Sequence, residues 1–156
     1  MASVMEYLSW DTDWRSDPKV RILERHYGPS AALIYQDICL FAARENGYFC
    51  TYSDTLIEYI SFGYVEKGDE EAAKNLVNSV IMDCLKIGLF DAGGFRRVSA
   101  LTCRRIQKAY AAYRKRSVEQ VVDKSLFIPT AEKAGKVPPP QNKPLTCGFV
   151  GDGNGE

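Results

Sequence analysis

Apolar side chains recur at intervals of three and four residues in several stretches of the chain, and this spacing predicts amphipathic helices. The predicted helices run from Pro18 to Tyr27, from Pro29 to Asn46-Gly47, from Ser53 onwards, and from about Asp69 to Gly88. A fifth helix is expected from Ser99 to about Arg116. The chain is therefore predicted to be mainly α-helical.

Residues that favour helix ends stand at the borders of these stretches. Asp17 offers a capping carboxylate before Pro18, and Ser53 offers a capping hydroxyl. Glu70 and Glu71 suit the positive end of a helix dipole, and Gly88 suits a helix C-terminus. The borders are thus predicted by side-chain chemistry as well as by spacing.

Two segments between the helices lack the helical period. Residues 48–50, Tyr-Phe-Cys, predict a short aromatic strand. Residues 89–91 and 95–98, separated by Ala92-Gly93-Gly94, predict a β-hairpin, because glycines tolerate the positive φ angles of a tight turn.

The order of helix, short strand, two helices and β-hairpin is that of a winged helix-turn-helix. We therefore predict a mainly α fold with a small β-hairpin (α+β), extended by a leading helix and a basic trailing helix. This domain is expected over residues 1–128. Residues 129–156 hold five of the seven prolines and five of the twelve glycines, and we expect them to form a flexible tail.

The formal net charge is zero, but the charges are segregated along the chain. Residues 1–91 carry 15 acidic and 8 basic side chains, net −7, and residues 117–156 carry 5 acidic and 4 basic ones, net −1. Residues 92–116 carry eight basic side chains and no acidic one. Salt screens charges from one another beyond ~8 Å, so the local density of charge, and not the net charge, decides whether a protein attracts a polyanion. Residues 92–116 therefore predict a polyanionic partner.

The eight cations are the candidate nucleic-acid-binding residues: Arg96, Arg97, Arg104, Arg105, Lys108, Arg114, Lys115 and Arg116. In the trailing helix most of the cations gather on one side, and an apolar stripe that includes Tyr110 and Tyr113 occupies another. The two tyrosines either pack against the core or stack on bases of single-stranded nucleic acid.

Base reading is not expected from the helix that would enter a major groove. That helix, from about residue 70 to 87, begins with two glutamates and offers mainly Lys74, Asn75, Asn78 and Lys86. Either the hairpin and trailing helix contact phosphates, or the same surface binds another protein.

Catalytic and metal-binding patterns are weak, so we expect no enzyme, no cofactor and no metal. His26 is the sole histidine, and the string Asp11, Asp13 and Asp17 lacks the glycine and glutamate of a calcium loop. The five cysteines form no C-x-x-C pair, which fits a reducing cytosol. The first residues do not form a secretion signal and no run of 18 apolar residues exists, so a cytoplasmic protein is expected.

Several short segments occur together in one order. They are Glu6-Tyr7-Leu8-Ser9-Trp10-Asp11-Thr12-Asp13, Asp17-Pro18-Lys19-Val20, Tyr27-Gly28, Ile34-Tyr35, Arg44-Glu45-Asn46-Gly47-Tyr48, Gly88-Leu89-Phe90-Asp91 and Leu101-Thr102-Cys103-Arg104-Arg105-Ile106-Gln107-Lys108. In these segments the chain resembles, over about residues 5–128, the N-terminal domain of phage and prophage replication proteins. Those proteins are related to DnaD-like replisome organisers.

The resemblance implies a winged-helix fold, a role in the initiation of DNA replication, and self-association through the leading segment. We therefore expect a non-catalytic protein that binds DNA, with single-stranded and duplex DNA left open as alternatives. Its other expected partners are itself or a replisome protein. The alternative is a protein-interaction or self-association module of a phage or mobile element, which acts on a host or replisome protein.

Overall fold

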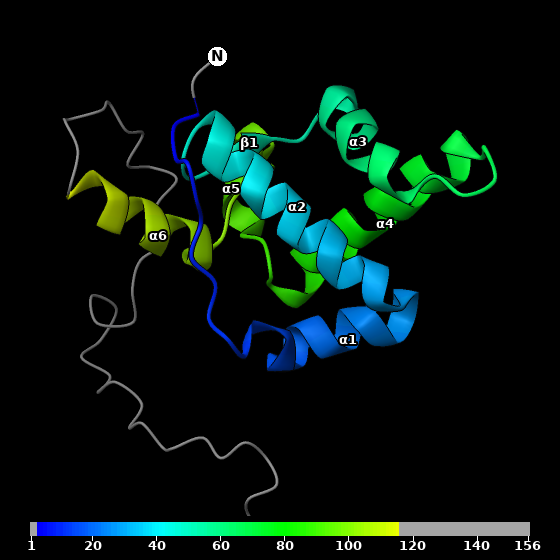
Figure 1. The fold of residues 1–156 in the computed structure, drawn as a ribbon, viewed down its shortest axis with the longest axis horizontal. Coiled ribbons are helices and arrows are strands. Elements are labelled where there is room, and N and C mark those ends of the chain that lie inside the picture. Colours follow the sequence, from blue (N-terminus) through cyan, green and yellow to red (C-terminus); the bar gives the residue numbers. More distant parts are fainter. Residues whose placement is uncertain (1–2, 116–156) are drawn as a thin grey trace, which may run out of the picture.

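The computed structural model describes residues 3–115, and its architecture is mainly helical (Figure 1). Residue 116 and the predicted tail, 129–156, lie outside the described residues, as does the predicted domain border at 128. The elements are α1 (Pro18–Tyr27), α2 (Pro29–Glu45), β1 (Cys50–Thr51), α3 (Asp54–Ser61), α4 (Glu70–Ile87), α5 (Ala92–Val98), β2 (Ala100–Leu101) and α6 (Arg104–Arg114). Short 3-10 helices, η1 (Trp14–Ser16) and η2 (Phe62–Tyr64), precede α1 and follow α3.

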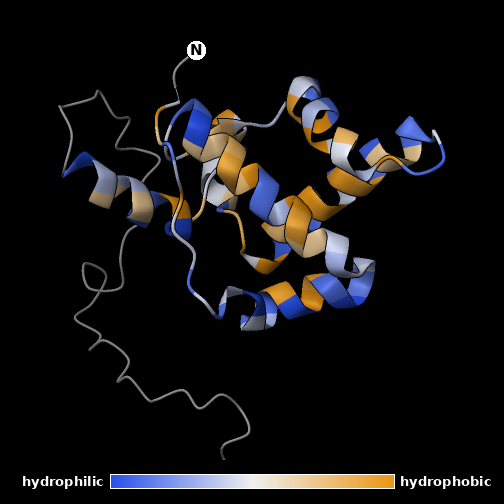
Figure 2. Cartoon of the chain, in the orientation of Figure 1, coloured by the Kyte–Doolittle hydropathy of each residue, from blue (hydrophilic) through white to orange (hydrophobic). Residues whose placement is uncertain are grey.

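The long helix α2 forms the centre of the domain. It contacts α1, α3, α4, α6 and β1, and Ile34, Tyr35, Ile38 and Cys39 on it are fully buried. Figure 2 shows the apolar residues of α1, α2 and α4 on the sides where these helices meet. Burial of apolar surface between these helices holds them together, since each buried aliphatic side chain contributes ~1.5–3 kcal/mol.

The predicted starts of α1, α3 and α4 are confirmed by capping hydrogen bonds. The Asp17 carboxylate accepts from the backbone N–H of Lys19 at 2.9 Å, and Ser53 Oγ accepts from that of Leu56 at 3.1 Å. Asp69 caps α4 in the same way. At its other end, α4 stops at Gly88, whose φ of 87° is left-handed and favours glycine.

The predicted β-hairpin over residues 89–98 is wrong, because residues 92–98 form the helix α5. The Asp91 carboxylate accepts a hydrogen bond from the backbone N–H of Gly94 at 2.8 Å and so caps a helix. Gly93 and Gly94 do not take the positive φ angles that a tight hairpin turn requires. Phe95 follows within the helix and packs edge-on against Tyr52, with ring centroids 5.4 Å apart.

The small antiparallel sheet joins distant parts of the chain. Cys50 pairs with Leu101 and Thr51 with Ala100, so β1 pairs with β2 across about fifty residues. The trailing helix consequently starts at Arg104 and not at Ser99, since residues 100–101 are extended and Ser99 has a left-handed φ of 54°. The α+β class is confirmed, with a sheet in place of a hairpin. None of the helices within residues 3–115 has the length and apolar character needed to span a bilayer.

Substituting Asp91 tests the helical assignment of residues 92–98. We expect Asp91→Ala to lower the free energy of unfolding by ~1 kcal/mol, because the helix loses its N-terminal cap. Asp91→Asn should have little effect, since asparagine caps about as well as aspartate. Urea unfolding followed by circular dichroism measures both. Equal stability of the alanine and asparagine variants would contradict the capping role.

Candidate nucleic-acid interface

The position of the basic helix α6 is set by contacts of the N-terminal segment and of α6 itself with the rest of the domain. The backbone N–H groups of Val4 and Met5 donate to carbonyls at the end of α2, so the N-terminal segment lies against that helix. On α6, Tyr110 is buried and stacks on Tyr48 at 5.1 Å between ring centroids. Gly47, beside Tyr110, leaves room for this ring. Figure 1 shows the N-terminal segment passing between α6 and α2.

The cations of α6 differ in their exposure to solvent. Arg104, Lys108 and Lys115 are exposed, whereas Arg105 and Arg114 are half-buried. The exposed positions follow the helical period, so these three side chains share the outer face of α6.

The remaining predicted cations lie on other parts of the chain. Arg96 and Arg97 are exposed on the last turn of α5, which replaces the predicted hairpin. Arg116 lies outside the described residues.

Arg105 is held by aromatic side chains. Its Nη1 donates to the hydroxyl of Tyr35 at 3.2 Å, and its guanidinium lies 4.9 Å from the ring centroid of Trp10. Its Nε is buried without a hydrogen-bond partner. Within residues 3–115 no carboxylate lies within ion-pair distance of Arg105. A half-buried guanidinium without a carboxylate costs free energy, and an incoming anion would offset that cost.

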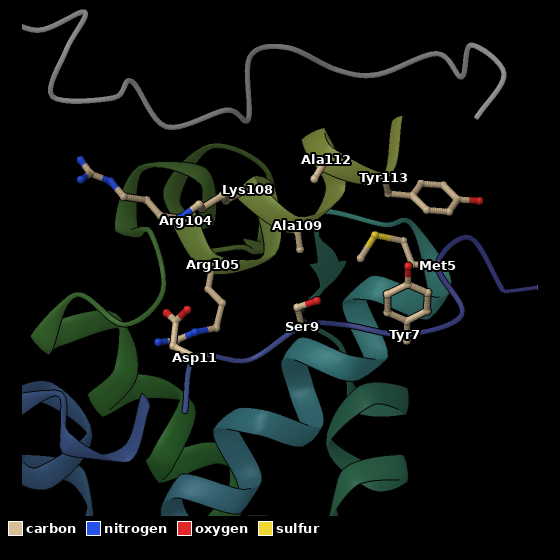
Figure 3. A pocket seen from close by; sticks show the side chains of 10 residues that line it. All are labelled: Met5, Tyr7, Ser9, Asp11, Arg104, Arg105, Lys108, Ala109, Ala112 and Tyr113. Atoms are coloured by element: carbon tan, nitrogen blue, oxygen red, sulfur yellow. The ribbon is translucent and has the colours of Figure 1, made fainter. Parts of the chain in front are cut away.

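A pocket of about 390 Å³ lies between the N-terminal segment and α6 (Figure 3). Figure 3 shows the cations at one end of this pocket and the tyrosines at the other. The lining residues are Met5, Tyr7, Ser9, Asp11, Arg104, Arg105, Lys108, Ala109, Ala112 and Tyr113. Three of the eight candidate cations thus line one pocket together with one carboxylate, and aromatic and apolar residues line the rest of it. In Figure 3 the side chain of Arg105 runs toward Asp11, whereas that of Arg104 points away from it.

A group of buried thiols lies behind Arg105. Tyr35 donates its hydroxyl to Cys103 Sγ at 3.5 Å, and burial raises the pKa of Tyr35 far above its ordinary value. A hydrogen bond from the Cys39 thiol lowers the pKa of Cys103 to about 6 against the effect of burial, with smaller contributions from the backbone N–H of Ile106, from Tyr35 and from Arg105. Burial raises the pKa of Cys39. Both cysteines are buried in the core.

The tyrosines of α6 take different positions. Tyr110 is 1% exposed and belongs to the core, so packing and not base stacking is its role. Tyr113 is half-buried, lies 6.3 Å from Tyr110 between ring centroids, and lines the pocket. Tyr113 also packs against the core, so the packing alternative applies to both tyrosines. Stacking of Tyr113 on a base stays a prediction.

The polar side chains of α4 are engaged within the protein. Lys74 forms an ion pair with Glu58, with 3.6 Å between Nζ and Oε1. The side-chain oxygen of Asn78 accepts a hydrogen bond from the hydroxyl of Tyr52. Both side chains therefore have partners within the protein.

The sequence did not identify the residues that surround Arg105. Trp10 and Tyr35 come from the N-terminal segment and from α2, far along the chain from α6. The segment that contributes Met5, Tyr7 and Ser9 to the pocket has no helical or strand period that would have suggested a pocket wall. Spacing alone therefore predicted the cations but not their surroundings.

The structure places His26 near Asp83 and Asp17 at the start of α1. Residues 3–115 contain no group of three or more His, Cys, Asp or Glu side chains placed to hold a metal ion. His26 Nδ1 lies 3.9 Å from Asp83 Oδ2, and its side chain is 58% exposed. Asp17, the last residue of the acidic string, caps α1.

Residues 7–106 match the family described as Lin1244/Lin1753-like, N-terminal, which is a family of unknown function. The match spans the N-terminal segment and the start of α6, and so includes Trp10, Tyr35 and Arg105. No curated protein and no solved structure matches the chain. Because the match covers well over half of the sequence, this chain belongs to the Lin1244/Lin1753-like N-terminal family.

Proposed function

We propose that this protein is a non-catalytic DNA-binding protein that contacts the phosphate backbone through the cations of α5 and α6. The proposal rests mainly on one observation: residues 92–116 carry eight cations and no carboxylate. Of these, Arg96, Lys108 and Lys115 are exposed and form no ion pair with another residue of the described chain. Such groups neutralise phosphates and release counterions, which favours association with a polyanion.

Phosphate contact fits this protein better than base reading. The helix that would enter the major groove begins with Glu70 and Glu71, and its Lys74 and Asn78 already bind Glu58 and Tyr52. Phosphate contacts fix a protein on DNA without reading sequence, whereas base-edge contacts supply specificity. We therefore propose binding with weak sequence preference.

We assign the finer fold as a variant of the winged helix. In this assignment α3 and α4 form the helix-turn-helix, β1 and β2 form what remains of the sheet, and α5 stands in place of the first strand of the wing. The role in phage or prophage DNA replication rests on the resemblance over residues 5–128. A DnaD-like relationship belongs to the same proposal.

A salt titration tests the proposed DNA binding. If six or more cations contact phosphates, affinity for DNA should fall by about 10³-fold between about 50 and 200 mM salt. Fluorescence anisotropy with labelled single-stranded and duplex DNA measures this dependence. A slope near zero in a plot of log affinity against log salt, or no binding at about 50 mM salt, would overturn the proposal.

Self-association is a second candidate function, favoured by exposed apolar side chains away from α6. Leu40, Tyr59 and Phe62 are 41%, 49% and 71% exposed, and they line one depression of about 460 Å³ between α2 and the α3–η2 region. A second copy of the chain would cover this surface. Light scattering on the titration samples separates the candidates, because a dimer that does not respond to DNA favours self-association.

A further inference from the structure

We propose that the pocket between the N-terminal segment and α6 binds one unpaired nucleotide of a DNA strand. This inference rests on the proposed function and makes it more specific, since it selects single-stranded over duplex DNA. The pocket volume of about 390 Å³ lies within the usual range for small-ligand sites and suits a single nucleotide.

The side chains along the pocket change from cationic to small and then to aromatic, which matches the order of phosphate, sugar and base in a nucleotide. At one end Arg104, Arg105 and Lys108 offer positive charge for a phosphate. At the other end Tyr7 and Tyr113 offer ring surfaces for a base (Figure 3). Small or apolar side chains, among them Ala109 and Ala112, lie between the two ends and leave room for the sugar.

Arg105 is the pocket residue that would gain most from a bound anion, because its half-buried guanidinium has no carboxylate partner among the described residues. It lines the pocket, its Nη1 is fixed by Tyr35, and Trp10 lies against its guanidinium. No carboxylate of the described residues pairs with it, and Asp11 at the pocket edge lies beyond ion-pair distance. A planar guanidinium that is already oriented loses little freedom when it binds a phosphate oxygen.

The tyrosines make the inferred ligand an unpaired nucleotide. In a duplex both faces of each base are stacked, so a base reaches Tyr7 or Tyr113 only when it leaves the stack. Base stacking on aromatic side chains tolerates any base and contributes ~1–3 kcal/mol per base. Tyr7 is 65% exposed and therefore accessible to such a base.

Two alanines on α6 give a matched test. Ala112 lines the pocket, whereas its neighbour Ala111 is also exposed and does not line it. Ala112→Leu narrows the pocket and Ala111→Leu does not, and neither changes charge. Tyr7→Leu removes an exposed ring, and Tyr59→Leu on α3 serves as its control. The probes are a labelled oligodeoxynucleotide of about 12 nucleotides and the duplex of the same sequence.

We expect Ala112→Leu and Tyr7→Leu each to weaken single-strand binding about tenfold relative to Ala111→Leu and Tyr59→Leu. Duplex affinity should be the same in each matched pair. If single-strand affinity is also the same in each pair, or the wild-type protein binds only duplex, the inference is overturned while the proposed function stands.

Free deoxyadenosine monophosphate distinguishes the remaining cases. Shifts of the Ala109 and Ala112 methyl resonances on its addition, lost with Tyr7→Leu, would support nucleotide binding in the pocket. If the wild-type protein bound this free nucleotide but neither the single-stranded nor the duplex probe, the proposed DNA binding would fail. The inference that the nucleotide belongs to a DNA strand would be overturned with it. Absence of all three kinds of binding would overturn both proposals.

Discussion

Replacing Arg104 and Lys108 together by glutamate is expected to weaken DNA binding by about 100-fold or more at about 100 mM salt. Both side chains are exposed on the outer face of α6, one helical turn apart. Each reversal removes a charge-assisted contact with a phosphate and adds repulsion in its place. The slope of log affinity against log salt should also become less steep by about two, because two fewer phosphates are neutralised.

The double variant should keep its fold, since neither side chain belongs to the core. Arg105 is left unchanged for the opposite reason: it is half-buried against Trp10 and Tyr35, and a carboxylate there would disturb packing. Anisotropy titrations measure binding, and circular dichroism checks the fold.

The control for the double variant is Arg25→Glu with Lys67→Glu, two exposed cations outside α5 and α6 that give the same change in net charge. An equal loss in the control would show that net charge and not this surface governs binding. No loss in the α6 variant would contradict the proposed interface.

Local rules predicted those parts of the fold that local contacts determine. The starts of α1, α3 and α4 follow from Asp17, Ser53 and Asp69, whose side chains bond backbone groups two or three residues away. The same rule explains the failure at residues 92–98. Asp91 is a capping residue too, but the two glycines after it favoured a hairpin turn, because glycine is poor in helices.

Long-range contacts determined what the sequence did not reveal. Because β2 pairs with β1, the trailing helix begins only at Arg104. No pattern within residues 99–103 predicts that β1 is the pairing partner. The period of α6 placed Arg104 and Lys108 on an outer face, as the structure has them, because a helix face depends only on spacing. The environment of Arg105 depends on Trp10 and Tyr35, and only tertiary packing brings these together.

Gly47 is the residue whose substitution should disturb this packing most. Its φ is +92°, and a Cβ atom there would lie 2.4 Å and 2.6 Å from ring carbons of Tyr110. Tyr110 is 1% exposed and stacks on Tyr48, so its ring has no free space into which to move. We expect Gly47→Ala to lower the free energy of unfolding by ~3 kcal/mol or more, from backbone strain and overpacking combined.

Gly68→Ala separates the two causes. Gly68 has a similar φ of +79°, but a Cβ atom there meets nothing within 4 Å. Its substitution should cost ~1 kcal/mol from backbone strain alone, so the difference between the variants in urea unfolding measures the clash with Tyr110. Similar losses in both would mean that the Tyr110 ring moves aside at little cost. Because Tyr110 fixes α6 against the domain, a large loss at Gly47 would also tie the position of the cationic surface to the core.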